Sequence, residues 1–213
     1  MPKITKIETQ KRKGRFNIYV DGEFVVGIGD DLLVQEGIEV GKVINPKGVQ
    51  KLVYKSKVEK LFDKALNLLG YRPRSKQEIR NKLWQRVAKL KIQKELREDL
   101  IRCTLDQLEE RGYLDDKKFA KWWVKERIRS RPRGKLLLRS ELFKKGIERK
   151  VIDEVLREYS QNDEISWAER IAEKRESRHE TLEPEKKREK MAAYLHGRGF
   201  TWEVINTVLE SFR

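Results

Sequence analysis

The sequence repeats itself over most of its length, and this internal repeat limits the possible folds more than any other feature. The tripeptide Arg72-Pro73-Arg74 recurs 59 residues later as Arg131-Pro132-Arg133. A second pattern, Leu-x3-Gly followed by an apolar residue, occupies residues 142–147 and recurs 53 residues later at residues 195–200. Tandem units of this length are typical of helical-repeat proteins, in which each unit packs against its neighbours.

Within each unit, apolar residues are spaced three and four apart, as on one face of an α-helix. Two helices joined by a short turn cannot bury both of their apolar faces without a third helix. We therefore predict three three-helix repeats, over residues 58–111, 112–160 and 161–213. The predicted fold class is mainly α, and repeats joined in this way would form an elongated, curved body with few contacts between neighbouring repeats.

Residues 1–57 follow a different pattern and predict a small extension that contains a β-hairpin and a short helix. Two apolar segments, residues 16–20 and 23–28, flank Asp21-Gly22, a dipeptide suited to a two-residue hairpin turn. Residues 4–9 could add a third strand. A hairpin alone is marginally stable in water, so we expect it to pack on a helix that follows.

Helix starts are marked by cap sequences. Asp30-Asp31 is expected to cap a short helix, and Asn45-Pro46 resembles an N-cap followed by proline at the first helical position. Residues 56–59 and 75–78 each fit a capping box, in which Ser and Glu bond each other's backbone N–H groups. The first of these boxes leaves open whether one helix or two cover residues 46–69.

Positive charge is concentrated in the middle of the chain. The 213 residues include 50 Lys/Arg and 35 Asp/Glu, and residues 117–150 hold fourteen Lys/Arg against three acids. Lys117, Lys121, Lys125 and Arg129 recur every four residues along one helix. A row of like charges costs about 0.2–0.5 kcal/mol per adjacent pair, so the row favours an anionic partner over a merely solvated surface.

We predict a partner-binding or DNA-binding surface formed by this basic helix and by the two Arg-Pro-Arg turns. Its members are Arg72, Arg74, Lys117, Lys121, Lys125, Arg127, Arg129, Arg131, Arg133 and Lys135. Trp122 and Trp123, which are 100° apart on the same helix, cannot both point into one core. A role in the core or between repeats is favoured over base stacking.

No catalytic constellation is present, so we expect a protein that is not an enzyme and has no cofactor. Cys103 is the only cysteine, and the two histidines are seventeen residues apart, which argues against a disulfide and a metal site. The sequence has no phosphate-binding loop of the Gly-x4-Gly-Lys type. Without a long apolar run or a heptad seam, the expected state is a cytoplasmic monomer with no membrane contact.

Several of these segments together resemble the RecX family of recombination regulators. The matching segments are Gly-Tyr-Leu-Asp-Asp-Lys-Lys-Phe-Ala at 112–120, the spacing of Arg127, Arg131 and Gly134, Glu-Leu-x2-Lys-Gly-Ile at 141–147, Arg-Ser-x2-Glu-Ile-x3-Leu at 74–83, and Tyr-Leu-x2-Arg-Gly-Phe at 194–200. One departure lies at residues 84–90, which lack the glycine of the short turn that the family usually shows there.

The resemblance implies a regulator that acts in DNA repair and the SOS response by binding the RecA filament on single-stranded DNA. Such a protein lies in the filament groove, blocks strand exchange and coprotease activity, and promotes disassembly. The sequence leaves open whether it occupies the groove or caps filament ends. A second hypothesis is a basic helical module that binds single-stranded nucleic acid directly, and a third is a helical scaffold for an unrelated acidic protein.

Overall fold

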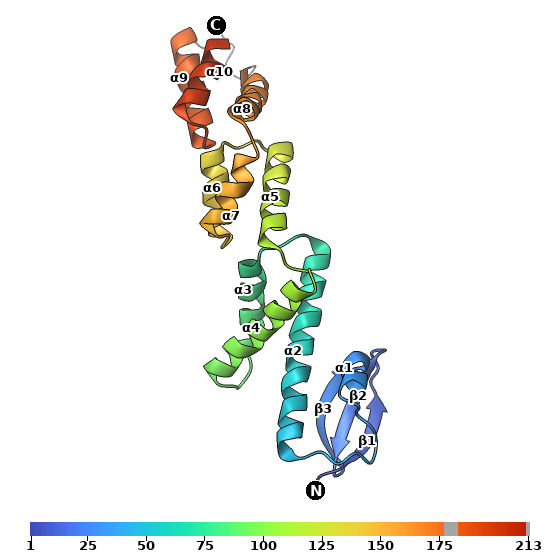
Figure 1. The fold of residues 1–213 in the computed structure, drawn as a ribbon. Helices are drawn as coiled ribbons and strands as arrows, with labels where there is room; N and C mark the ends of the chain where they lie inside the picture. Colours follow the sequence, from blue (N-terminus) through green and yellow to red (C-terminus); the bar gives the residue numbers. More distant parts are fainter. Residues whose placement is uncertain (177–182, 212–213) are drawn as a thin grey trace. The chain divides into compact units, whose positions relative to one another are not determined.

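The computed structural model describes residues 1–176 and 183–211, and it is mainly helical with a small N-terminal sheet (Figure 1). The chain divides into two compact units. Unit 1 consists of Met1–Arg72 and Ile79–Leu114, and unit 2 consists of Pro73–Glu78 and Asp115–Arg213. Within the described residues, no helix is both long enough and apolar enough to cross a membrane.

The sheet of unit 1 has three antiparallel strands in the order β1 (Ile4–Thr9), β2 (Arg15–Val20) and β3 (Glu23–Gly29). The predicted turn at Asp21-Gly22 is confirmed, because both residues have the positive φ angles, 49° and 87°, that a two-residue hairpin turn requires. The third strand, which the sequence offered only as an option, is present.

Helix α1 (Asp30–Gln35) does not begin as predicted. Its N-cap is Gly29, which has no capping side chain, and Asp30 and Asp31 lie in the first turn of the helix, where the carboxylate of Asp30 accepts from the N–H of Asp31 at 3.0 Å. The backbone N–H of Gly29 donates to the carboxylate of Glu59 at 3.0 Å. The N-cap residue is therefore bound by a tertiary contact that local sequence could not reveal.

A single long helix, α2 (Pro46–Tyr71), covers the region where the sequence allowed one helix or two. Asn45 caps it as predicted, accepting a hydrogen bond of 2.7 Å from the N–H of Gly48. The predicted capping box at residues 56–59 is wrong. Ser56 is buried inside the helix, and its hydroxyl donates to the carbonyl of Gly27 at 2.7 Å. Both polar residues of that box bind the sheet, which explains why the motif marks no helix start.

The helical part of unit 1 is completed by α3 (Lys76–Val87) and α4 (Lys94–Glu110). The capping box at the start of α3 is confirmed, because the hydroxyl of Ser75 accepts from the N–H of Glu78 at 3.1 Å. One apolar cluster joins α2, α3 and α4. Its buried members are Val58, Leu61, Phe62, Ala65, Ile79, Leu83, Val87, Leu100, Ile101, Leu105, Leu108 and Leu114.

Unit 2 contains α5 (Asp116–Ser130), α6 (Lys135–Lys144), α7 (Arg149–Arg157), α8 (Gln161–Glu176), α9 (Pro184–Gly197) and α10 (Trp202–Ser211). Their buried apolar residues form one continuous cluster. This cluster links the last two predicted repeats, but the helices of unit 2 that pack closely on one another all lie within α5–α7 or within α8–α10, in agreement with the expectation of few contacts between neighbouring repeats. The boundaries of the predicted domains stay a prediction.

The internal repeat corresponds to two similar junctions in unit 2. At the first, the hydroxyl of Ser75 donates to the carbonyl of Lys145 at 2.7 Å. At the second, the N–H of Gly134, at the equivalent place after Arg-Pro-Arg, donates to the carbonyl of Arg198 at 3.0 Å. Each Arg-Pro-Arg turn is thus bonded to the Lys-Gly or Arg-Gly turn that ends a later helix. The sequence repeat marks this joint.

Candidate partner and nucleic-acid interface

Helix α5 carries most of the predicted surface, and its cap and apolar face determine which side chains point outward. Asp115 caps the helix by accepting from the N–H of Lys118 at 2.9 Å, and this hydrogen bond holds the pKa of its carboxyl below the usual range. Phe119, Ala120 and Val124 are buried. The lysine row therefore lies along a side of the helix that is partly or fully exposed.

Two lysines of the row already face acidic residues of the same chain. The Nζ of Lys117 lies 2.5 Å from Oε1 of Glu154, and that of Lys121 lies 2.6 Å from Oε1 of Glu158. Glu154 belongs to α7, and Glu158 is the C-cap residue that follows it. All four side chains are substantially exposed, so these ion pairs contribute little to stability and can be exchanged. The like-charge row is thus partly neutralised by a matching row of glutamates, and both rows have a spacing of four residues.

Glu141 of α6 anchors two of the predicted arginines. Its carboxylate accepts from Nε of Arg127 at 3.0 Å and from Nε1 of Trp123 at 2.9 Å, and it also pairs with Arg133. The Glu141 side chain is only 13% exposed. The guanidinium carbon of Arg127 lies 4.2 Å from the ring centroid of Trp123, a cation–π distance. Arg127 and Arg133 therefore hold the turn between α5 and α6 in place.

Trp122 and Trp123 are both half-buried and both pack against the apolar cluster of unit 2. The ring centroids of both tryptophans lie 5.8 Å from the ring centroid of Phe119. The two indole rings therefore share one buried neighbour. The favoured packing role agrees with these contacts.

Lys135 is also bound within unit 2. Its backbone N–H donates to Oε1 of Glu164 at 2.8 Å, and its Nζ donates to the carbonyl of Tyr159 at 2.7 Å. Arg72 and Arg74 are half-buried beside the turn that precedes α3. Four of the ten predicted residues are exposed: Lys117, Lys125, Arg129 and Arg131. Of these, Lys117 pairs with Glu154 and Arg129 pairs with Glu126.

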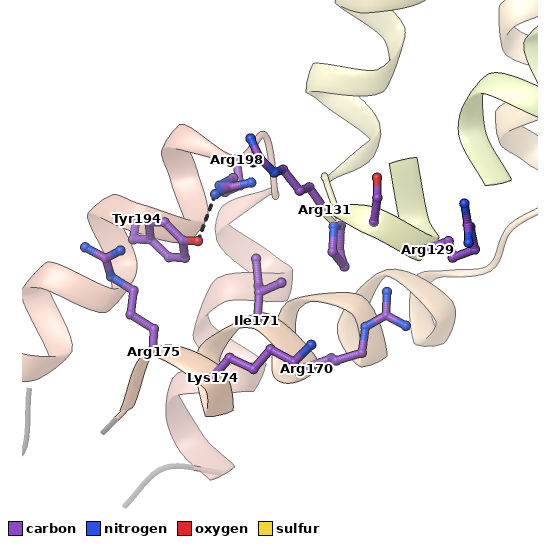
Figure 2. A pocket seen from close by; sticks show the side chains of 10 residues that line it. Arg129, Arg131, Arg170, Ile171, Lys174, Arg175, Tyr194 and Arg198 are labelled. Carbon is purple, nitrogen blue, oxygen red and sulfur yellow. Dashed lines mark hydrogen bonds between the residues drawn. The ribbon is translucent and has the colours of Figure 1, made fainter. Parts of the chain in front are cut away.

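The fold brings four further cations, which were not predicted from the sequence, close to Arg129 and Arg131. Together they line a cleft of about 380 Å³ between the end of α5, α8 and the end of α9 (Figure 2). The added cations are Arg170, Lys174, Arg175 and Arg198. A count of charge along the sequence cannot find them, because α8 and α9 also carry many acids. The internal sequence repeat gave one indication of the cleft, because the turn at Arg131 and the turn at Arg198 both belong to its repeated motifs. Among the described residues, no group of three or more His, Cys, Asp or Glu could hold a metal ion.

Two adjacent carboxylates at the start of α8 are expected to respond oppositely to pH. Burial raises the pKa of Glu164, whereas hydrogen bonds from Ser160 lower the pKa of Asp163. Ionised Glu164 therefore destabilises the fold above its folded-state pKa, and protonation relieves this cost as pH falls. Ionised Asp163 stabilises the fold above its unfolded-state pKa, and that stabilisation is lost as pH falls through its folded-state pKa.

We accordingly expect Glu164→Gln to be at least as stable as the parent protein at pH ~7, and Asp163→Asn to be less stable. Both differences should shrink toward pH ~3, below the ordinary carboxyl range. Thermal unfolding across this pH interval checks the expectation, with each variant serving as the control for its neighbour. A shift of both variants in the same direction at neutral pH would contradict it.

The fold and this surface define a class: a helical-repeat protein with a strand-containing N-terminal part and a strongly basic stretch at residues 117–150. Family descriptions match in the same order. They are the regulatory protein RecX N-terminal domain at residues 2–45 and the first, second and third three-helix domains of RecX at residues 62–87, 115–156 and 162–209.

Full-length relatives agree with these matches. The chain is 32% identical over 212 residues to a protein of Clostridium acetobutylicum named regulatory protein RecX, covering 97% of this chain and 94% of the relative. It is 30% identical to the Bacillus subtilis protein of the same name, covering 99% and 77% of the two chains. A crystal structure of a regulatory protein RecX superimposes with a TM-score of 0.79 at 25% identity, covering 99% of this chain and all of the other. The chain belongs to the RecX family.

Proposed function

We propose that this protein binds the RecA filament on single-stranded DNA and inhibits its recombinase and coprotease activity without catalysing a reaction. The observation that carries the proposal is the series of RecX family matches between residues 2 and 209, in their expected order. The relatives are named regulatory proteins RecX, and the resemblance to this family implies RecA as the target. In this proposal, the protein acts as a monomer that lies in the filament groove and promotes disassembly of the filament.

The contacts proposed for this role divide into two groups. Lys125, Arg129 and Arg131 are exposed and can reach a partner directly, and Lys117 and Lys121 can exchange their exposed glutamate partners at a cost of about 0–1 kcal/mol each. The other five predicted residues are proposed to keep the surface in shape and not to contact the partner directly. Arg127, Arg133 and Lys135 are bound inside unit 2, and Arg72 and Arg74 are half-buried. Many modest contacts then supply affinity, and positive charge speeds association with an anionic filament.

Direct binding to naked single-stranded nucleic acid is the second candidate function, and the cleft lined by six cations favours it.

The two candidate functions differ in their response to competitor DNA. The deciding measurement is the rate of ATP hydrolysis by RecA on single-stranded DNA, with this protein titrated in and excess naked single strands added. Inhibition at a ratio to RecA well below one, surviving the competitor, is expected for a filament-directed regulator. Inhibition that disappears with the competitor would show simple sequestration of DNA, and no inhibition would refute the proposal.

A pair of matched variants tests the lysine row. Lys117→Gln/Lys121→Gln and Glu154→Gln/Glu158→Gln break the same two ion pairs but change the net charge in opposite directions. If the lysines contact the filament, the first variant should weaken inhibition about fivefold, since two exposed contacts amount to roughly 1 kcal/mol. The second variant should inhibit as well as the parent or better. Half-inhibitory concentrations measure both. Equal changes in the two variants would mean that the lysines serve only the pairing with α7.

A further inference from the structure

We propose that the cleft between the end of α5, α8 and the end of α9 binds the phosphodiester backbone of a single-stranded nucleic acid. The proposal deepens the proposed function and rests on it for the kind of partner, since it names the place in this chain where a strand would lie. It adds residues of α8 and of the turn after α9 to an interface that the sequence located only in α5 and the Arg-Pro-Arg turns.

The first argument is the density of positive charge. Five arginines and one lysine line the cleft, and its other lining residues are Ser130, Pro132, Ile171 and Tyr194, none of them acidic. The cations come from three separate segments (Figure 2). The positive charges of the cleft also repel the charge of the neighbouring Arg133. Burial lowers the pKa of its guanidinium, and the charges of Arg127, Arg198 and Arg131 lower it further. Folding these groups together without an anion is unfavourable, so a bound anion would stabilise the arrangement.

The second argument is that the cations retain hydrogen-bonding capacity. Within the described chain, Arg129 is the one member of the six with an acidic partner, Glu126, at 2.9 Å. Arg170 donates to the backbone carbonyl of Ile128, and Arg198 donates to the hydroxyl of Tyr194 at 3.0 Å. Each guanidinium has five N–H donors, so most of these remain available.

Arg175 is positioned at the cleft by an aromatic contact. Its guanidinium carbon lies 4.0 Å from the ring centroid of Tyr194, a cation–π distance. This contact holds a positive charge in the cleft without an acidic partner among the described residues.

The third argument concerns the chemistry of the ligand. The side chains that line the cleft are almost all donors, because the hydroxyl of Ser130 already donates to the carbonyl of Glu126 and that of Tyr194 accepts from Arg198. A peptide would bring its own backbone N–H donors, which would find few acceptors here. A phosphodiester backbone presents acceptors along its whole length, and guanidinium groups bind phosphate oxygens in a two-pronged geometry. The lining contains no set of acceptors for base donors, so binding should be insensitive to sequence.

The test compares two double variants that lose equal charge. Arg131→Gln/Lys174→Gln removes two exposed cations of the cleft, and Lys82→Gln/Arg86→Gln removes two exposed cations of α3 in unit 1. Binding of labelled oligodeoxythymidine and oligouridine to the full chain is measured by fluorescence anisotropy between ~50 and ~200 mM salt, and thermal unfolding verifies that both variants fold. The cleft variant should lower the slope of log affinity against log salt by about 1.4, because each phosphate contact on a single strand contributes about 0.7. The α3 variant should keep the parent slope.

An unchanged slope and affinity in the cleft variant, or no oligonucleotide binding by the parent protein, would overturn the proposal. Displacement of the oligonucleotide by an equal charge concentration of oligoglutamate would also overturn it, in favour of an acidic protein partner. Comparison of the two oligonucleotides tells DNA from RNA as the source of the strand. RecA is absent from this assay, so the proposed function fails separately: a parent protein that binds strands through the cleft but leaves RecA ATP hydrolysis unchanged refutes the filament role alone.

Discussion

Replacing Leu142 with alanine is expected to destabilise unit 2 by about 2–5 kcal/mol, the range for truncating a fully buried leucine. Leu142 is 0% exposed and belongs to the apolar cluster that runs through α5 to α10. Because this cluster is continuous, the cavity would lie in a core that both of the last two predicted repeats share. The loss should therefore affect unit 2 as a whole and not α6 alone.

Leu136→Ala provides the control on the same helix. Leu136 is 54% exposed, so the same chemical change removes little buried surface and should cost no more than about 0.5 kcal/mol. Urea unfolding followed by tryptophan fluorescence measures both variants. Four of the five tryptophans, at positions 122, 123, 167 and 202, lie in unit 2, so the signal reports mainly on that unit. Equal midpoints for Leu142→Ala and the parent protein would contradict the core position of Leu142.

Gly134→Ala is expected to cost about 1–3 kcal/mol or more, although it adds a single methyl group. The backbone of Gly134 has φ −69° and ψ 159°, a conformation open to any residue, so the cost is steric and not conformational. A methyl group there would lie well inside van der Waals contact of the carbonyl of Gly199 and the N–H of Phe200. Backbone atoms cannot move aside as a flexible side chain can, so the second junction would have to open.

Gly70→Ala is the matched control. Gly70 lies within α2, and a methyl group there would meet nothing within 4 Å. Alanine is favoured over glycine in a helix by up to about 1 kcal/mol, so this variant should be neutral or stabilised. The same unfolding experiment, with circular dichroism added for unit 1, measures both changes. A Gly134→Ala protein as stable as the parent would show that the turn at Arg198 does not pack as tightly as described.

Local signals in the sequence were reliable where the partner residue was also local. The hairpin at Asp21-Gly22, the cap at Asn45 and the capping box at Ser75 all involve residues a few positions apart, and all are confirmed. The box at residues 56–59 failed because its polar groups bind the distant sheet. Likewise, Asp30 and Asp31 lie inside the first turn of α1, and the N-cap residue Gly29 donates its N–H to Glu59 of another helix. Local pattern cannot decide between a nearby and a distant hydrogen-bond acceptor.

The candidate surface was predictable in its location but not in its composition. Sequence placed the positive charge in α5 and the following turn. It could not show that Lys117 and Lys121 face Glu154 of α7 and the C-cap residue Glu158, although both pairs share the same spacing. The cleft was hidden because Arg170 and Arg198 reach Arg131 only through the packing of α8 and α9 on α5.

The motifs that indicated the family turn out to be mostly architectural. Gly112, Gly146 and Gly199 each follow a helix with positive φ angles of 73°, 78° and 84°, where a side chain would be strained. Glu141, in the same set of motifs, anchors Trp123 and two arginines. Motif residues thus identify the scaffold, and the residues proposed to bind a partner lie beside them.

The two junctions of unit 2 have a consequence for how such a chain can change in length. Each joins the turn between the first and second helices of one repeat to the turn between the second and third helices of the next repeat, through a backbone or hydroxyl donor and a carbonyl. A duplicated repeat would carry both halves of the joint, one for the repeat before it and one for the repeat after it. Length could then change by whole units of 53 to 59 residues without any new interface, whereas the loss of part of a unit would leave an unmatched joint.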